Sequence, residues 1–103
     1  MKRINIAGTS IVTGTALADA VLDFWTSIAK LHRLETAEIP FVDDDGTRQT
    51  AQLVLCAAVP LWTSTMDYEG PELTDAGTLS EITSRNATLD PLWGLAPVEG
   101  ADG

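Results

Sequence analysis

The stretch TAEIPFVDDDGTRQTAQLVL (Thr36 to Leu55) contains two β-like runs that are separated by three acids and a glycine. A three-residue loop at residues 44–46 would place Gly46 in the left-handed conformation that glycine tolerates and Asp43 opposite Thr47. Counting outward from this loop fixes the partner of every residue in the two runs. The loop chemistry therefore predicts a β-hairpin with a defined register.

The side chains support this register. On one face the pairs are Ile39 with Ala51 and Ala37 with Leu53; on the other they are Glu38 with Gln52, Pro40 with Thr50, and Val42 with Arg48. A slip of one residue would mix the apolar and polar faces, so the pattern specifies the register strongly. Because Pro40 has no N–H, its strand is expected at a sheet edge, or Pro40 directs its missing donor outward.

An earlier hairpin is predicted from two short β-like pieces, Arg3–Ile6 and Ser10–Val12, around Gly8 and Thr9. A two-residue loop would place Ile6 opposite Ile11. A three-residue loop would instead place Ile4 opposite Val12. The sequence does not choose between these two registers.

A long helix follows, with Thr15 as the expected N-cap after Gly14. Apolar residues recur at helical spacing and form one stripe: Leu17, Val21, Phe24, Ile28 and Leu31. A second row flanks this stripe and contains Ala18, Leu22, Trp25, Ala29 and His32. The apolar face is therefore wide, as expected for a helix that lies on a sheet.

Residues 53–59 are apolar on both faces, which indicates a strand that is covered on both sides or lies in a subunit contact. The segment 67–77 reads as an acidic loop. The capping-box spacing of Thr78 and Glu81 predicts a short helix over residues 79–88, which Asp90 and Pro91 end.

These elements predict a small α+β domain over residues 1–90, in the order β-β-α-β-β-α. Its four-stranded, mainly antiparallel sheet consists of two hairpins covered by the long helix. Residues 91–103 are expected to form a C-terminal tail that is partly ordered at Trp93.

Composition excludes several classes of function. Residues 1–34 contain four basic and two acidic side chains, whereas residues 35–103 contain two basic and 13 acidic ones. An acidic surface repels phosphates, so nucleic-acid binding is not expected. The sequence shows no membrane span and no signal-peptide core after Met1, which predicts a soluble, cytoplasmic protein. The single cysteine, Cys56, is read as a buried apolar side chain.

No motif predicts catalysis, a cofactor or a metal. Gly8 and Gly14 resemble the ends of a phosphate-binding loop, but the lysine that such a loop requires is missing. The acids at 43–45 lack the spacing of a calcium loop. His32 has no histidine partner for a metal, and no serine motif accompanies it.

The aromatic residues indicate a partner surface instead. Trp62 follows the apolar run, and a Pro/Gly-rich context holds Leu92, Trp93 and Leu95, which are expected to dock on their own domain or on another chain. The preferred hypothesis is a small acidic, non-enzymatic interaction or accessory protein that can self-associate as a homo-oligomer. One alternative is a ligand-binding or enzymatic domain with a pocket under the long helix. Another is an acidic inhibitor or nucleic-acid mimic that blocks a basic protein.

Overall fold

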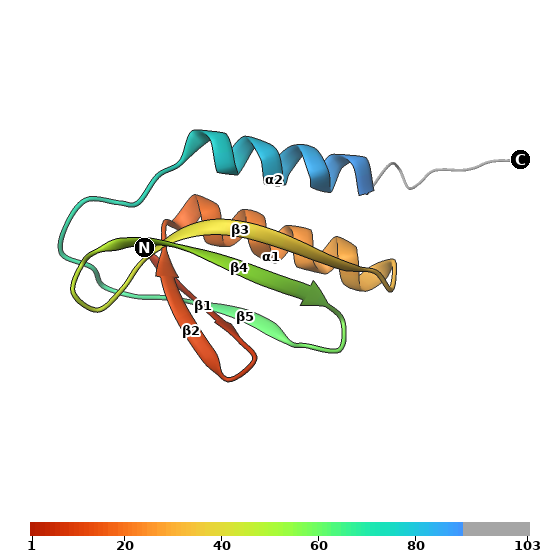
Figure 1. The fold of residues 1–103 in the computed structure, drawn as a ribbon, viewed down its shortest axis with the longest axis horizontal. Helices are drawn as coiled ribbons and strands as arrows, with labels where there is room; N and C mark the ends of the chain where they lie inside the picture. The colour runs from red at the N-terminus through yellow and green to blue at the C-terminus, as the bar shows by residue number, and fades with distance from the viewer. Residues whose placement is uncertain (90–103) are drawn as a thin grey trace, which may run out of the picture.

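Five strands form one antiparallel sheet in the computed structural model, which describes residues 1–89 (Figure 1). The strands are β1 (Lys2–Ile6), β2 (Thr9–Thr13), β3 (Leu34–Val42), β4 (Arg48–Cys56) and β5 (Leu61–Thr65). The helices are α1 (Thr15–Lys30) and α2 (Ala76–Leu89). The strands lie in the order β4-β3-β2-β1-β5, so the chain is an α+β fold with β4 and β5 at the two edges.

The fifth strand corrects the prediction of a four-stranded sheet. A turn after β4, in which the Val59 N–H donates to the Cys56 carbonyl at 3.1 Å, reverses the chain. The chain then pairs with β1, which brings Leu61 opposite Ile6. The element order is therefore β-β-α-β-β-β-α. Pro60 precedes the new strand and does not interrupt it.

The hairpin of β3 and β4 has the predicted register along its whole length, including Ile39 opposite Ala51. The Asp43 N–H donates to the Thr47 carbonyl at 3.0 Å, and the Gly46 N–H donates to the Asp43 carbonyl at 2.9 Å. Gly46 has a φ of 84°, the left-handed conformation that the three-residue loop requires. This part of the prediction is confirmed.

β3 lies inside the sheet, so the expectation that Pro40 marks an edge strand is wrong. Antiparallel pairs alternate between hydrogen-bonded and non-hydrogen-bonded types, and counting from Asp43 makes Pro40–Thr50 a non-hydrogen-bonded pair. The missing donor of Pro40 therefore faces β2 and not β4. On that side the Thr13 hydroxyl donates to the Pro40 carbonyl at 2.7 Å, and Val12 and Val42 form the one residue pair between β2 and β3.

The first hairpin has neither predicted register. Its two-residue turn is Ala7–Gly8, which pairs Ile6 with Thr9 and Ile4 with Ile11. Both turn residues have positive φ, 52° and 78°, as a type I′ turn requires. A turn at Gly8–Thr9 would have forced β-branched Thr9 into this conformation, which is costly.

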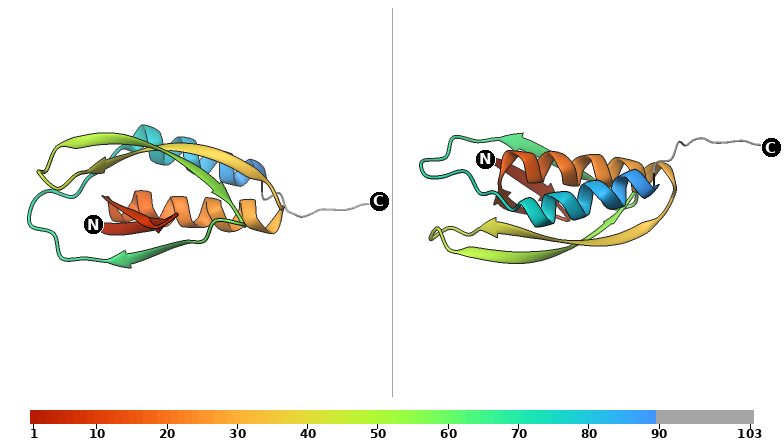
Figure 2. Two further views of the ribbon diagram at one scale, coloured as in Figure 1. Left: turned by 60° about the horizontal axis from the view of Figure 1, so that its bottom comes forward. Right: turned by 90° about the horizontal axis from the view of Figure 1, so that it is seen from above.

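The core lies between the sheet and α1, and α2 packs beside α1 (Figures 1 and 2). The two helices run side by side in the same direction on one side of the sheet (Figure 2). The predicted apolar face of α1 is confirmed by its buried residues, which are Leu17, Ala18, Val21, Phe24 and Ile28. Leu31 lies beyond the end of α1 and is 42% exposed, so it does not extend the stripe.

Two side-chain contacts complete the packing around α1. The Trp25 indole donates to the carbonyls of Cys56 and Val59, at 3.0 and 3.1 Å, and so joins α1 to the turn that precedes β5. The Arg85 guanidinium of α2 lies 4.8 Å from the centre of the Phe24 ring. Both contacts give a buried or half-buried aromatic side chain a polar partner.

Candidate functional site

The N-terminus of α1, where the sequence resembles a phosphate loop, is occupied by a side chain of the protein itself. Gly14 is the N-cap, and Thr15 does not cap the helix with its hydroxyl, which corrects the predicted N-cap. Instead the Thr15 N–H donates to the Glu72 carboxylate, 57 residues away. The other oxygen of Glu72 lies 2.9 Å from the Met1 amine.

This arrangement fixes the connection between β5 and α2 against the start of α1. The Met1 amine and the Thr15 N–H hold the pKa of Glu72 below its ordinary value. A Cβ added at Gly14 would lie 1.8 Å from the backbone oxygen of Leu73, so only glycine allows the two segments to approach this closely. The helix terminus thus has a structural anion in place of a ligand.

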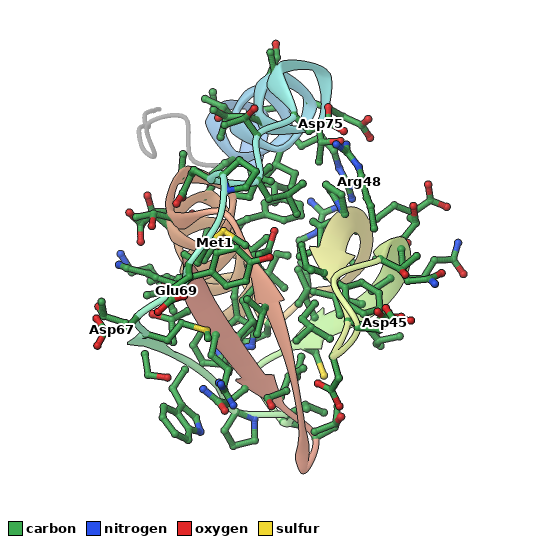
Figure 3. The ribbon with its side chains drawn as sticks, turned by 90° about the vertical axis from the view of Figure 1, so that its left-hand side faces the viewer. Met1, Asp45, Arg48, Asp67, Glu69 and Asp75 are labelled. Atoms are coloured by element: carbon green, nitrogen blue, oxygen red, sulfur yellow. The ribbon has the colours of Figure 1, made fainter. Side chains whose placement is uncertain are left out.

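The start of α2 is held in a similar way by Asp75. The Asp75 carboxylate accepts from the Thr78 N–H at 3.0 Å and from Arg48 of β4 at 2.8 Å (Figure 3). The hydrogen bond from Thr78, and then the Arg48 charge, lower the pKa of Asp75. Asp75 is therefore the N-cap, and α2 begins three residues before the helix that the Thr78 capping box predicted.

Two acidic loops that are far apart in sequence lie at the same end of the molecule. The β3–β4 loop contributes Asp43, Asp44 and Asp45, and the 66–75 connection contributes Asp67 and Glu69 beyond the two paired acids above (Figure 3). Hydrogen bonds from Asp43 and Thr47 lower the pKa of Asp45 to about 2. The Asp45 contact raises the pKa of Asp43. Within residues 1–89, no group of three or more His, Cys, Asp or Glu side chains is arranged to hold a metal ion.

The sheet face away from the helices carries a polar row that ends in an exposed tryptophan. Ser10 pairs with Asn5, and Asn5 pairs with Trp62, so their side chains lie on the same face of three adjacent strands. Trp62 is 60% exposed. The Asn5 amide donates to the carbonyls of Trp62 and Arg3, at 3.3 and 3.4 Å, which leaves the Asn5 Oδ1 as an acceptor.

A concave region of about 760 Å³ surrounds this row at the tip of the β1–β2 hairpin. Its other lining residues are Ile6, Ala7, Gly8, Thr9, Asp44 and Pro60. The region lies by the sheet and its turns, away from the interface with α1, where the sequence had suggested a pocket. Among residues 1–89, Asp44 is the one charged residue that lines it.

A second exposed apolar surface lies at the opposite edge of the sheet. Leu34 of β3 is 63% exposed and Val54 of β4 is 51% exposed, and both belong to the face away from the helices. Cys56, opposite Leu34, is half-buried and not the buried residue that the sequence suggested. The run 53–59 is thus uncovered on one face, which leaves the subunit-contact interpretation open.

Of the predicted partner residues, the structure describes Trp62 and shows it exposed. Leu92, Trp93 and Leu95 lie outside the described residues. His32 is exposed, follows the end of α1 and has a φ of 54°, so it does not belong to the helix. Sequence reasoning missed Asn5 and Glu72. Asn5 contacts Trp62 of β5, and Glu72 contacts Thr15 of α1. No local sequence pattern predicts that these distant segments meet.

Comparison with known proteins adds no relative: no protein-family model, no curated protein and no solved structure matches this chain. Neither helix in residues 1–89 has the length and apolar character that crossing a membrane requires.

Proposed function

We propose that this protein is a non-enzymatic interaction protein that binds a second copy of itself through β4. The observation that carries this proposal is the outer edge of β4, a nine-residue strand at the end of the sheet with which no other strand of residues 1–89 pairs; this edge is called the open edge below. Natural edge strands are commonly protected by charges, proline, bulges or short length. From Gln49 to Cys56, β4 has no charged residue and no proline.

The backbone of β4 is suited to pairing. Residues 49, 51, 53 and 55 face β3 in the hydrogen-bonded pairs, so Thr50, Gln52 and Val54 direct their N–H and C=O groups to the open edge. A two-fold axis at Gln52 would pair all nine residues of one β4 with the other, and Thr50 would lie opposite Val54 of the second copy. Such an isologous contact places no like charges opposite each other.

The exposed apolar side chains strengthen this surface. Val54 and Leu34 lie beside the edge on the uncovered face of the sheet. In a dimer with a continuous sheet, each Val54 would pack against Thr50 of the second copy, so one such contact would lie on each side of the two-fold axis. Burial of apolar area in these contacts would add to the backbone hydrogen bonds.

The experiment compares Gln52→Pro with Gln52→Thr by analytical ultracentrifugation over a concentration series. Both variants lose the exposed hydrogen bond from Gln52 to Glu38, but only proline removes the central N–H of the open edge. We expect the wild type and Gln52→Thr to reach twice the 11.0 kDa chain mass, and Gln52→Pro to stay monomeric. Val54→Lys should also weaken the dimer. A monomeric wild type, or a dimeric Gln52→Pro, would refute the proposal.

The presence of two acidic loops at the same end of the molecule favours a second candidate, an acidic inhibitor or mimic that binds a basic protein. Its test is binding of a lysine-rich peptide by a variant with Asp67→Asn and Glu69→Gln, and by a control with Asp19→Asn and Asp23→Asn on α1. The first variant should bind more weakly than the control, and added salt should weaken wild-type binding steeply. Salt-insensitive binding would count against this candidate.

A further inference from the structure

The concave region beside Trp62 is a candidate ligand site that does not depend on the proposed self-association. It lies at the tip of the β1–β2 hairpin, whereas the proposed dimer contact lies at the β4 edge of the sheet. Trp62, which is 60% exposed, offers a flat aromatic surface to this region. The question is which class of ligand the surrounding groups would accept.

The side-chain polar atoms on this face include several acceptors. The Asn5 amide uses its N–H groups on backbone carbonyls, so its oxygen remains available, and Ser10 contributes a hydroxyl that can accept or donate. Asp44 contributes a carboxylate from the adjacent loop. No Lys, Arg or His lines the region. Arg3, the nearest cation by register on this face, directs its guanidinium to the Met66 sulfur at 3.8 Å.

The charge of the whole chain is negative, like that of Asp44. The chain carries a net charge of −9, and Asp43 and Asp45 flank Asp44 in the loop. An aromatic face attracts cations through its quadrupole, and a nearby carboxylate adds a Coulombic attraction. A row of acceptors between an indole and a carboxylate therefore favours a positively charged ligand over an anion or an uncharged apolar molecule.

We propose that this region binds a small organic cation with an ammonium group, which would lie on the Trp62 indole, with the rest of the ligand directed along the row toward Ser10 and Asp44. Asn5 and Ser10 would accept hydrogen bonds from polar groups on the same ligand. The length of the row, which crosses β2, β1 and β5 at about 4.8 Å per strand, suits a ligand with a hydroxyl or amine beyond its charged end.

The test uses two probes of nearly the same shape: choline, and 3,3-dimethylbutan-1-ol, in which carbon replaces the charged nitrogen. Two-dimensional amide NMR of the full chain follows each titration. Choline should shift the signals of Asn5, Ser10 and the Trp62 indole, and the neutral alcohol should shift them much less. Methyl glucoside serves as a third probe for an uncharged polar ring.

Three variants assign the binding. Trp62→Leu should weaken choline binding about tenfold, and Asp44→Asn, which lies at the far end of the row, should weaken it less. Asp67→Asn removes an acid from the same end of the molecule but outside the concave region, and should leave the affinity unchanged. Because Trp62 is largely exposed, we expect Trp62→Leu to keep the wild-type circular dichroism and thermal midpoint.

The outcomes separate this proposal from the one on self-association. Gln52→Pro should bind choline as the wild type does, whichever oligomer it forms. Equal binding of choline and the neutral alcohol, a response to methyl glucoside alone, or unchanged choline binding by Trp62→Leu would each overturn the cation site. None of these results would bear on the β4 contact.

Discussion

The two hairpins of the sheet differ in how strongly their sequences determine their structure. The β3–β4 hairpin has nine-residue strands and a loop with Gly46 at positive φ, and its register follows from the sequence. The β1–β2 hairpin has five-residue strands, and its turn places Ala7 at positive φ. Alanine seldom adopts this conformation, so Gly8 marks the turn but nothing in the sequence marks Ala7 as its first residue.

The comparison shows that the sequence predicts a strand register where two independent features require the same pairing. In β3–β4 the turn chemistry and the alternation of side chains give the same pairing. In β1–β2 the strands are too short to distinguish registers by pattern, and the turn depends on the sheet that surrounds it. The predictions below test this difference, beginning with the largest effect.

Replacement of a core residue in the well-specified hairpin should cost the most. Ile39→Ala removes a fully buried side chain and should lower the free energy of unfolding by about 3 kcal/mol. Its neighbour Glu38 faces solvent, so Glu38→Ala should change this free energy by less than about 0.5 kcal/mol. Urea denaturation measures both, and similar costs for the two variants would show that the faces are misassigned.

The contact between the two hairpins should show the next largest effect. Thr13→Val keeps the shape of a fully buried side chain but leaves the Pro40 carbonyl without its donor, at a cost of about 1–3 kcal/mol. Thr13→Ser retains the hydroxyl and should cost less. If denaturation finds serine the more damaging of the two, the hydrogen bond does not join the hairpins as described.

The two turn glycines should be equally sensitive despite the difference between their hairpins. A Cβ at Gly8 or at Gly46 would meet no atom within 4 Å, so alanine introduces only the cost of positive φ. Each of Gly8→Ala and Gly46→Ala should lower the free energy of unfolding by about 1–2 kcal/mol. A much larger loss at one position would reveal a contact that the open space does not suggest.

A substitution in the Ala7–Gly8 turn should be able to increase the stability of the protein. Ala7→Asn creates the Asn-Gly pair that type I′ turns prefer and should raise the free energy of unfolding by about 0.5–1 kcal/mol. Ala7→Val places a β-branched residue at positive φ and should lower it. Thermal unfolding of the two variants gives the sign, and stabilisation by valine would contradict the assigned turn.

The smallest effect concerns pH and is confined to the β3–β4 loop. Because folding raises the pKa of Asp43, this residue stabilises the folded state when it is protonated. Its contribution to stability is complete below the ordinary pKa and is lost as pH rises through the raised pKa. Asp45, with a pKa of about 2, has the opposite sign: its contribution is present above its ordinary pKa and is lost as pH falls toward 2.

At neutral pH, Asp43 is therefore the unfavourable member of the pair. Asp43→Asn should raise the thermal midpoint at pH 7, and its advantage should disappear below the ordinary pKa of 3.8. The shift caused by Ala7→Asn should not depend on pH, because Ala7 and Gly8 do not titrate. An advantage of Asp43→Asn that grows on acidification would show that the Asp45 contact does not raise the pKa of Asp43.

Local signals predicted the α+β class, the face of α1 that is buried and the whole β3–β4 register. They did not predict β5, because its pairing with β1 joins Ile6 to Leu61 and depends on the closing turn before it. Nor did they predict the capping of α1 by Glu72. Glu72 lies 57 residues after Thr15, and no local sequence pattern links the two residues. The acceptor row at Trp62 was hidden for the same reason: only the assembled sheet brings its three strands together.

The single residue pair between Val12 and Val42 has a consequence for how the sheet moves. The two halves, β5-β1-β2 and β3-β4, are joined along this line mainly by side chains and by the helices above them. Amide protons at this boundary should exchange with deuterium before those inside either hairpin. The protein would then open as two ribbons hinged beneath α1, with the boundary between β2 and β3 separating first.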